Sequence, residues 1–475
     1  MDFDRDLLSR QQARELLEGA QRAFRELSRL PQEKLDRFAS AIAEAGERNA
    51  EPLGQLACEE TGFGNPQDKA EKNRFASRCV FDAVREMKTV GLLRREPGLW
   101  EIGVPVGVIA GIVPSTNPTS TVLYKSIIAL KAGCAIVFSP HPGAVNCTRK
   151  AAQVAQEAAE AAGCPRGAIA CLPTPTMDAV QELFRHRHTR LILATGGGAM
   201  VKAAYSSGKP AIGVGAGNGP AYIHRSADIP RAVSDILRSK TFDNGTICAS
   251  EQSVIVERCC AERVKAEFLR QGAYFLSESE AAAVGKLLLR ADGSMNPQCV
   301  GKTAQAIARL AGLSGVPETA KVLLAHETQA GPARPYSREK LCPVLAFFVE
   351  ENEEKILARV CEVLYGEGAG HTFAMHAGDE EAIRRFALAV PVSRFLVNTP
   401  AALGGVGMTT ALFPALTLGC GAVGGSSTSN NISPMELINV RRVAWGKDEP
   451  PVRAGGGIDP ALIDALTEEI LKKLR

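Results

Sequence analysis

The sequence predicts an α/β protein built on parallel β-sheets. Between residues 105 and 224, short apolar runs alternate with amphipathic or alanine-rich segments. This is the order of β-α-β units, in which helices cover both faces of a parallel sheet. The alternation restarts after residue 225, so we expect a second α/β domain. A chain of 475 residues, 45% of them hydrophobic, can bury a core in each domain.

The elements follow from periodicity and from the positions of glycine and proline. Apolar residues three and four apart predict amphipathic helices over residues 7–30, 33–57 and 66–89. The alternating region predicts strands over 106–112, 135–138, 169–172, 191–194 and 211–214. Its helices are expected over 120–132, 144–162, 177–186 and 200–207. In the second domain we expect helices over 230–241 and 259–271 and a strand over 252–256.

The composition argues against several classes of protein. Lys and Arg number 55 against 52 Asp and Glu, so no surface for nucleic acid is expected. The 13 cysteines form no C-x-x-C pair, which is typical of reduced thiols in a cytoplasmic protein. Two long stretches without charged residues, 102–124 and 395–435, are interrupted by Gly, Pro and polar residues, so no membrane span is predicted. The H-x-H at 186–188 lacks a third ligand at suitable spacing, and no metal is expected.

Three polar turns are candidates for chemistry. Cys248 lies among small polar residues between a helix and an apolar strand, where amide donors can activate a thiolate; alternatively it is a buried, inert thiol. Asn117 follows a predicted strand in IVPSTNPT and could donate to an oxyanion, or form an ordinary Asx turn. The triple glycine of LILATGGGAM could approach a phosphate at a helix N-terminus, or serve only a tight turn.

Four segments occur in one order that points to a family: IVPSTNPT, ATGGGAM, DNGTICASEQ and EKLCPVL. Together with LTLGCGAVGGSSTSNN near residue 420, they resemble the aldehyde dehydrogenase superfamily. The resemblance covers residues 10–447 and is closest to the CoA-acylating branch, which includes acylating acetaldehyde and propionaldehyde dehydrogenases and the N-terminal half of bifunctional aldehyde–alcohol dehydrogenases.

The resemblance implies roles for individual residues. Cys248 is expected to be the catalytic nucleophile and Asn117 the oxyanion donor, while His371 is a candidate for proton transfer, with a structural role equally open. NAD would contact Pro114, Ser115, Thr116, Ser139, His141, Pro142, Thr195, Gly196, Gly197, Gly198, Val214, Gly215 and Glu339. Within this set, residues 139–142 would meet the adenosine ribose, residues 195–198 the pyrophosphate, and Glu339 the nicotinamide ribose.

One departure from the family pattern favours a particular reaction. Hydrolytic members carry a glutamate that activates water, and Val214 stands in its place. A valine cannot activate water, whereas the thiol of coenzyme A is a far better nucleophile. We therefore expect NAD-dependent, CoA-acylating oxidation of propionaldehyde or acetaldehyde through a thioester on Cys248. The alternatives are a hydrolytic aldehyde dehydrogenase that finds its base elsewhere and a non-catalytic scaffold of the same superfamily.

The resemblance also implies the domain organisation. A Rossmann-type NAD-binding domain is expected over 1–91 and 105–222, and a catalytic α/β domain over 223–418. A β oligomerisation arm would combine 92–104 with 419–447 and join a homodimer or homotetramer.

The C-terminal end differs in character. Residues 448–457 are rich in Pro and Gly and predict a linker. Residues 458–475 predict an amphipathic helix with an apolar stripe of Leu462, Ile463, Leu466, Ile470 and Leu474. This helix resembles the encapsulation peptides of bacterial microcompartment enzymes, which would place the protein inside such a compartment, with shell or core proteins as partners. Packing on its own oligomer is the alternative, and the charge balance of the polar face disfavours a membrane surface.

Overall fold

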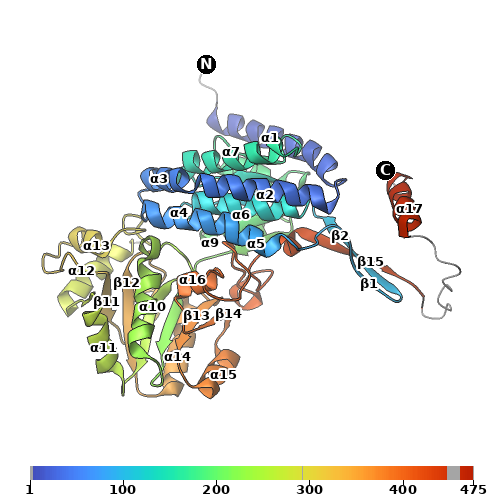
Figure 1. Cartoon of the computed structure of the whole chain (residues 1–475). Coiled ribbons are helices and arrows are strands. Elements are labelled where there is room, and N and C mark those ends of the chain that lie inside the picture. The colour runs from blue at the N-terminus through green and yellow to red at the C-terminus, as the bar shows by residue number, and fades with distance from the viewer. Residues whose placement is uncertain (1–3, 291–292, 447–459, 474–475) are drawn as a thin grey trace.

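The computed structural model describes residues 4–290, 293–446 and 460–473, and these residues form three β-sheets (Figure 1). The first sheet is five-stranded and parallel, in the order β5-β4-β3-β6-β7. Its strands are β3 (Val108–Ile112), β4 (Ala135–Ser139), β5 (Ile169–Cys171), β6 (Thr189–Thr195) and β7 (Ala211–Val214). The helices of this half are α1 (Arg5–Leu27), α2 (Gln32–Arg48), α3 (Ala50–Thr61), α4 (Pro66–Arg74), α5 (Val80–Val84), α6 (Pro118–Lys131), α7 (Val145–Ala161), α8 (Met177–Arg185) and α9 (Gly198–Tyr205).

The second sheet is seven-stranded and also parallel, in the order β10-β11-β12-β9-β8-β13-β14. Its strands are β8 (Gly219–Ile223), β9 (Glu251–Glu257), β10 (Ala273–Phe275), β11 (Val322–His326), β12 (Val344–Glu350), β13 (Gly370–His376) and β14 (Val392–Val397). Its helices are α10 (Ile229–Thr241), α11 (Ala261–Arg270), α12 (Glu278–Leu288), α13 (Ala304–Leu310), α14 (Glu353–Gly366), α15 (Glu380–Ala389) and α16 (Ala401–Gly405).

Most predicted elements between residues 106 and 271 are present, with ends shifted by at most two residues. The strand β8 is not among the predicted elements, and the predicted domain boundary after residue 222 falls within it. It pairs with β9 and β13 in the second sheet. We therefore propose to place the domain boundary between β7 and β8.

Two predicted helices are wrong in their extent. The helix expected over 33–57 is divided at Asn49, whose side-chain Nδ2 donates to the Ala45 carbonyl at 2.8 Å. Pro52, in the first turn of α3, has no N–H with which to continue α2. The helix expected over 66–89 becomes α4, a π-helical turn at Phe75–Cys79 and α5, and ends at Val84. Beyond it, Lys131 Nζ donates to the Arg85 carbonyl and thereby fixes a non-helical chain.

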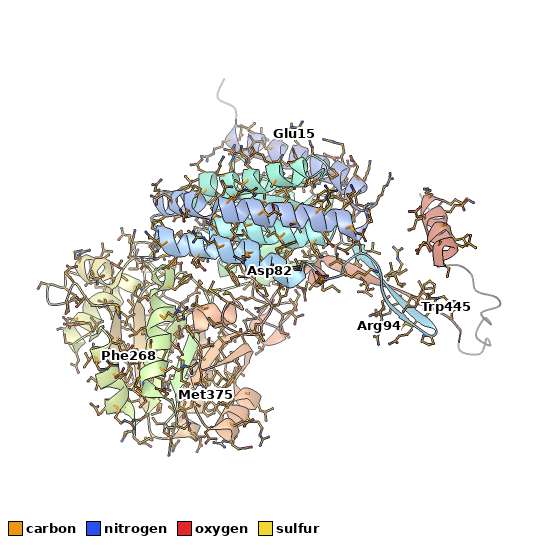
Figure 2. All side chains as sticks on the ribbon, viewed as in Figure 1. Glu15, Asp82, Arg94, Phe268, Met375 and Trp445 are labelled. Carbon is orange, nitrogen blue, oxygen red and sulfur yellow. The ribbon has the colours of Figure 1, made fainter. Side chains whose placement is uncertain are left out.

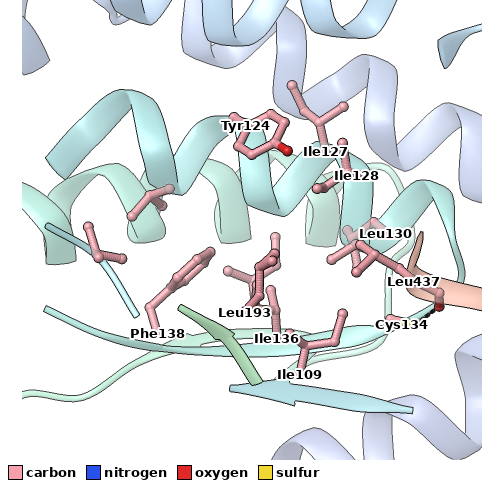
Figure 3. Close-up of a cluster of buried hydrophobic side chains, with 14 of the residues drawn as sticks. Ile109, Tyr124, Ile127, Ile128, Leu130, Cys134, Ile136, Phe138, Leu193 and Leu437 are labelled. Carbon is pink, nitrogen blue, oxygen red and sulfur yellow. Dashed lines mark hydrogen bonds between the residues drawn. The ribbon is translucent and has the colours of Figure 1, made fainter. Parts of the chain in front are cut away.

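The core of the first half lies between helix α6 and the five-stranded sheet (Figure 3). Every residue of α6 is buried, and its apolar side chains, such as Ile127 and Leu130, cover β3, β4 and β6. Burying one such side chain contributes about 1.5–3 kcal/mol. Lys125 is also buried in this helix and donates from Nζ to the carbonyls of Ile112 at 2.7 Å and Leu193 at 2.9 Å. It thereby ties the carboxyl ends of β3 and β6 together.

The third sheet projects from the body as a narrow arm (Figures 1 and 2). It is antiparallel and joins β1 (Gly91–Glu96), β2 (Leu99–Pro105) and β15 (Ile438–Ala444), with β2 in the centre. Figure 2 places Arg94 and Trp445 on this arm. Leu92, Val440 and Trp445 are exposed there, so the arm presents apolar side chains to its surroundings.

The C-terminal helix α17 (Pro460–Lys473) is drawn apart from both large sheets in Figure 1. Leu462 is 54% exposed and Ile470 is 55% exposed, and Leu466 and Leu471 are exposed beside them. Of the predicted stripe, Leu462, Leu466 and Ile470 are thus exposed, Ile463 is partly buried, and Leu474 lies outside the described residues. No helix in the described part of the chain is long and apolar enough to cross a membrane.

Candidate active site

A cavity of about 340 Å³ lies where the two large sheets face each other. One wall consists of the loops that follow β3, β4, β6 and β7, which all end at the same edge of the parallel first sheet. The opposite wall consists of residues 246–248 and 339–341, which precede β9 and β12 of the second sheet. The carboxyl edge of one sheet therefore meets the amino edge of the other.

Most of the predicted site residues line this cavity. They are Pro114, Ser115, Thr116, Asn117, Ser139, His141, Pro142, Thr195, Gly196, Gly197, Val214, Gly215, Cys248 and Glu339. Gly198 and His371 are not among the lining residues. Gly198 begins helix α9 behind the glycine turn, and His371 is buried at the start of β13. The functional roles of all these residues stay predictions.

Cys248 is partly exposed at the cavity wall. The walls remove its thiol from bulk water, which raises its pKa to about 12, and the nearby Glu339 and Cys420 act in the same direction. The Arg394 guanidinium acts in the opposite direction. The thiol is therefore protonated at neutral pH in the free protein, and a substrate or cofactor must change its surroundings before the thiolate forms.

The turn before Cys248 has an unusual backbone. Asp243 and Asn244 both adopt left-handed conformations, with φ of 47° and 50°. Asp243 Oδ2 accepts hydrogen bonds from Lys69 Nζ at 3.0 Å, Lys72 Nζ at 2.5 Å and Thr246 Oγ1 at 2.7 Å. A left-handed conformation costs a residue with a Cβ about 1–3 kcal/mol, so this buried carboxylate holds a turn that the chain would otherwise relax.

Asn117 lies at the start of α6, next to Pro118, which begins the helix. Its side chain makes no capping hydrogen bond, so the ordinary turn role left open by the sequence is not the one observed. Oδ1 accepts from Lys72 Nζ at 2.6 Å. Nδ2 lies 3.2 Å from Thr116 Oγ1 and 3.4 Å from the Thr246 carbonyl. The carboxamide oxygen of Asn117 is thus held by Lys72, a residue of helix α4.

Glu339 is the only carboxylic acid among the described residues that line the cavity. Its Oε1 accepts from the Gly217 N–H at 2.9 Å. Burial raises its pKa to about 8, and the charge of Glu367 adds to this effect. Val214, on the cavity wall, has no group that could accept a proton from water.

The hydrogen bonds around His371 favour one position for its proton. Arg394 Nε, which can only donate, lies 3.3 Å from Thr372 Oγ1. For the hydrogen of this hydroxyl, the described residues provide one acceptor, His371 Nδ1 at 2.8 Å. Burial and the charge of Arg394 hold the pKa of His371 well below its usual 6.5. The imidazole is therefore neutral, and pairing of the Thr372 hydroxyl hydrogen with Nδ1 favours the tautomer with the proton on Nε2.

His371 is close to the nucleophile even though it does not line the cavity. A Cβ added at Gly217 would lie 3.2 Å from His371 Cε1 and 2.0 Å from the Cys248 carbonyl oxygen. Glycine is therefore required at 217, where the imidazole and the nucleophile backbone meet. The Nε2 atom is buried and has no hydrogen-bond partner among the described residues.

Sequence reasoning missed four residues that support the site: Lys69, Lys72, Asp243 and Arg394. The two lysines lie three residues apart in a predicted amphipathic helix, where charges ordinarily face solvent. Asp243 belongs to the DNGTICASEQ motif, but nothing in the motif shows that its carboxylate is buried. Arg394 precedes a run of apolar residues and carries no motif. The two lysines, Asp243 and Arg394 lie far apart in the sequence, and only the folded structure brings them to the site.

The glycine turn fits a dinucleotide. A Cβ added at Gly197 or Gly215 would meet no atom within 4 Å, and one at Gly196 would meet only Met200 at 3.9 Å. The backbone there faces open space, as the approach of a pyrophosphate requires. No group of three or more His, Cys, Asp or Glu side chains suited to a metal occurs among the described residues.

Residues 6–287 match the model of the aldehyde dehydrogenase family. The chain belongs to this family. Succinate-semialdehyde dehydrogenase (acetylating) of Clostridium kluyveri is 35% identical over 442 residues, which cover 92% of this chain and 97% of that protein. The bifunctional aldehyde-alcohol dehydrogenase AdhE of Escherichia coli is 44% identical over 90% of this chain. The chain spans 49% of AdhE, about half the length of that relative.

Solved structures of the family superpose closely. A probable aldehyde dehydrogenase from Listeria monocytogenes is 57% identical, with a TM-score of 0.93 over 94% of this chain and 99% of that chain. An acetylating aldehyde dehydrogenase from Geobacillus thermoglucosidasius is 48% identical, with a TM-score of 0.92 over 95% of this chain and 100% of that chain. A propionaldehyde dehydrogenase from the fucose utilisation microcompartment of Clostridium phytofermentans is 26% identical, with a TM-score of 0.83 over 93% of this chain and 98% of that chain. These comparisons confirm the predicted family and the α/β fold.

Proposed function

We propose that the protein oxidises a short aliphatic aldehyde, such as acetaldehyde or propionaldehyde, and transfers the acyl group to coenzyme A, with NAD as the oxidant. The observation that carries this proposal is a single cavity that Asn117 and Cys248 line from opposite walls, with Val214 in the place of a base for water. The acetylating and propionaldehyde dehydrogenases among the relatives support the same reaction.

The first half of the reaction follows from the two polar side chains. Cys248 Sγ forms a bond to the aldehyde carbon, the π electrons of the carbonyl move to its oxygen to form an oxyanion, and the thiol proton is released to solvent as the one proton that the overall oxidation produces. Asn117 Nδ2 donates a hydrogen bond to that oxygen. Bound NAD supplies the acceptor for the hydride that leaves this carbon. The acyl group then remains on Cys248 as a thioester.

The second half needs little base catalysis. The thiol of coenzyme A attacks the thioester carbon, and Cys248 departs as the leaving thiolate. The proton lost by one sulfur is regained by the other, so the proton balance closes between the two thiols. The hydrogen bonds around Thr372 favour a proton on Nε2 of His371, and on that basis we propose a hydrogen-bond donor role for this residue in place of general-base catalysis.

The cofactor would be held by the loops that follow the first sheet. We propose that residues 139–142 meet the adenosine ribose, residues 195–198 the pyrophosphate, and Glu339 the nicotinamide ribose. Because Glu339 is largely protonated at neutral pH, it can donate to a ribose oxygen as well as accept.

The test combines a cofactor omission with a variant. The wild-type protein should form NADH and acyl-CoA in equal amounts and almost no free acid, and turnover should stop when CoA is left out. Cys248→Ala should abolish turnover while NAD affinity, measured by fluorescence titration, stays within about threefold. Mass spectrometry without CoA should find the acyl group on Cys248. Free acid without CoA, or an adduct on Cys420 or Cys342, would overturn the proposal.

Assembly is a second property that the exposed surfaces favour. We propose that the arm of β1, β2 and β15 joins copies of the chain into a homodimer or homotetramer. Its exposed apolar side chains and the free edge of β15 support this role.

We propose further that α17 directs the enzyme into a bacterial microcompartment. The supporting observation is the uncovered apolar stripe of this helix. A helix of 14 residues is marginal in water unless a partner covers such a stripe. The microcompartment relative from Clostridium phytofermentans supports the proposal, which would place the enzyme in the cytoplasm, inside a shell that retains its reactive aldehyde.

A further inference from the structure

We propose that Lys72, on helix α4, is a positioning residue that fixes the rotation of the Asn117 carboxamide and so aims its N–H donor at the oxyanion. The inference rests on the proposed function, because it concerns the donor of that same site. Lys72 itself does not line the cavity, and it acts through Asn117.

The orientation of the carboxamide follows from the chemistry of the ammonium group. A lysine Nζ has three hydrogens and no acceptor. The Asn117 atom 2.6 Å from Lys72 Nζ must therefore be the oxygen, which leaves the NH₂ group on the opposite side. There one Nδ2 hydrogen donates to Thr116 Oγ1 at 3.2 Å, and the Thr246 carbonyl, the acceptor for the other hydrogen, lies at 3.4 Å. Because N–H···O bonds ordinarily span 2.7–3.2 Å, the contact at 3.4 Å is weak, and this second hydrogen is the one available to an oxyanion.

Lys72 is itself fixed in place. It is buried, and its three hydrogens meet three acceptors: Asn117 Oδ1, Asp243 Oδ2 at 2.5 Å and Thr246 Oγ1 at 2.9 Å. Two of these acceptors belong to the turn that precedes Cys248. One ammonium group therefore joins the loop of the oxyanion donor to the turn of the nucleophile, two segments that come from different sheets.

The same cluster provides a matched control. Lys69 lies one helical turn earlier, is also buried, and donates to the same Asp243 Oδ2 at 3.0 Å. Its other bond goes to the Thr116 carbonyl at 3.1 Å, not to the Asn117 side chain. Loss of Lys69 removes a buried cation from the same carboxylate but leaves the Lys72 to Asn117 bond in place. A purely structural role for the cluster predicts equal effects of the two lysines.

The experiment is a double-mutant cycle with Lys72→Met and Asn117→Ala, and Lys69→Met as the control. The readout is the rate of the NADH burst from aldehyde and NAD without CoA, which reports the step that the oxyanion donor serves. Each variant of the cycle should lower the burst rate by about 10²–10³-fold, and the double variant should be no worse than about threefold below either one. Apparent NAD affinity should change less than about threefold. Lys69→Met should keep the burst rate within about tenfold while its melting temperature falls as much as that of Lys72→Met.

Additive losses in the double variant, or an equal loss of burst rate in Lys69→Met, would overturn the inference. Asn117→Asp keeps an acceptor for Lys72 but lacks the N–H donor, so it should remain folded and lose the burst as Asn117→Ala does; a normal burst in Asn117→Asp would also overturn it. The burst precedes the use of CoA. Turnover without CoA would therefore contradict the proposed acyl transfer. The burst rates of the four proteins in the double-mutant cycle could still be compared.

Discussion

Cys248, Glu339 and His371 all favour their neutral forms at neutral pH. Burial is the largest cause for each: it raises the pKa of the thiol to about 12 and of the carboxyl to about 8, and it holds the imidazole pKa well below 6.5. Arg394 is the nearby cation that acts on both Cys248 and His371. These three side chains therefore carry little charge until a ligand enters, and thiolate formation at Cys248 is tied to ligand binding.

The first residue-scale prediction concerns the alkylation of Cys248. Because its pKa is raised, the thiolate fraction at pH 6–9 is small and grows about tenfold with each pH unit. The rate of iodoacetamide labelling of this residue in the free enzyme should grow in the same way without a plateau, measured by peptide mass spectrometry. Cys248→Ala gives the background from the other thiols. A plateau near pH 8.5 would show an unshifted thiol.

The second concerns the tautomer of His371. In protein labelled with ¹⁵N-histidine, its Nε2 should show the shift of a protonated nitrogen and Nδ1 that of an acceptor nitrogen. Because burial and Arg394 lower the pKa, this pattern should persist from pH 8 down to pH 5, below the usual histidine midpoint. His371→Gln identifies the signals. A titration near pH 6.5, or a proton on Nδ1, would contradict the hydrogen-bond assignment.

Sequence reasoning reached the cavity residues through short motifs, because Cys248, Asn117 and the glycine turn lie in contiguous, recognisable segments. It did not reach Lys72 or Arg394. A buried lysine and a surface lysine look alike in a helix, and burial here depends on Asp243, 171 residues further along the chain. No local pattern encodes such a pairing.

Helices α2 and α3 show the same limit at the scale of the element. Their apolar periodicity runs through residue 49, so the pattern alone indicates one helix, while Pro52 was the local signal that could have divided it. The π-helical turn at Phe75–Cys79 has no comparable signal. Tight packing accompanies it, since a Cβ on Gly46 would lie 2.2 Å from Ser77 Oγ.

The element-scale prediction concerns Lys125 of α6. Lys125→Met removes the donor to the Ile112 and Leu193 carbonyls and should lower the free energy of unfolding by about 2–4 kcal/mol, measured by urea denaturation. Burial lowers the Lys125 pKa well below 10.5, so the unfolded chain binds the extra proton. The stability that Lys125 provides is then greatest near pH 10 and shrinks as the pH falls.

A control for Lys125 is the exposed Lys202 of α9. Lys202→Met should change the free energy of unfolding by less than about 0.5 kcal/mol at every pH. If Lys125→Met were equally mild, or if its deficit grew toward low pH, the tie between β3 and β6 would not contribute in this way.

At the scale of the whole molecule, the alternation of strands and helices was enough to predict two parallel-sheet units. The position of β8 was not predictable, because five apolar residues suit either sheet and the choice depends on pairing with β13, about 150 residues away along the chain. After α16 the chain packs again on the first half of the molecule, where Val406, Leu418 and Leu437 belong to its hydrophobic core. This packing also depends on long-range contacts that no local pattern indicates.

The prediction for the whole molecule concerns the C-terminal segment. Deletion of residues 448–475 should leave kcat, KM and the elution volume in gel filtration unchanged, because the apolar side chains of α17 are exposed. The same segment fused to a fluorescent protein should co-purify with microcompartment shells. A fusion with Leu466 and Ile470 both changed to Glu should not. Dissociation of the oligomer on deletion would instead show that the helix packs on its own assembly.

The meeting of two opposed sheet edges has a consequence for how the enzyme matures. Each large sheet is drawn from its own stretch of chain, so each can acquire secondary structure before the other is complete. The nucleophile arrives with one sheet and its oxyanion donor with the other, and neither half holds the pair. During synthesis or refolding, catalytic competence must therefore lag behind the recovery of helix and strand, and it appears only when the halves dock.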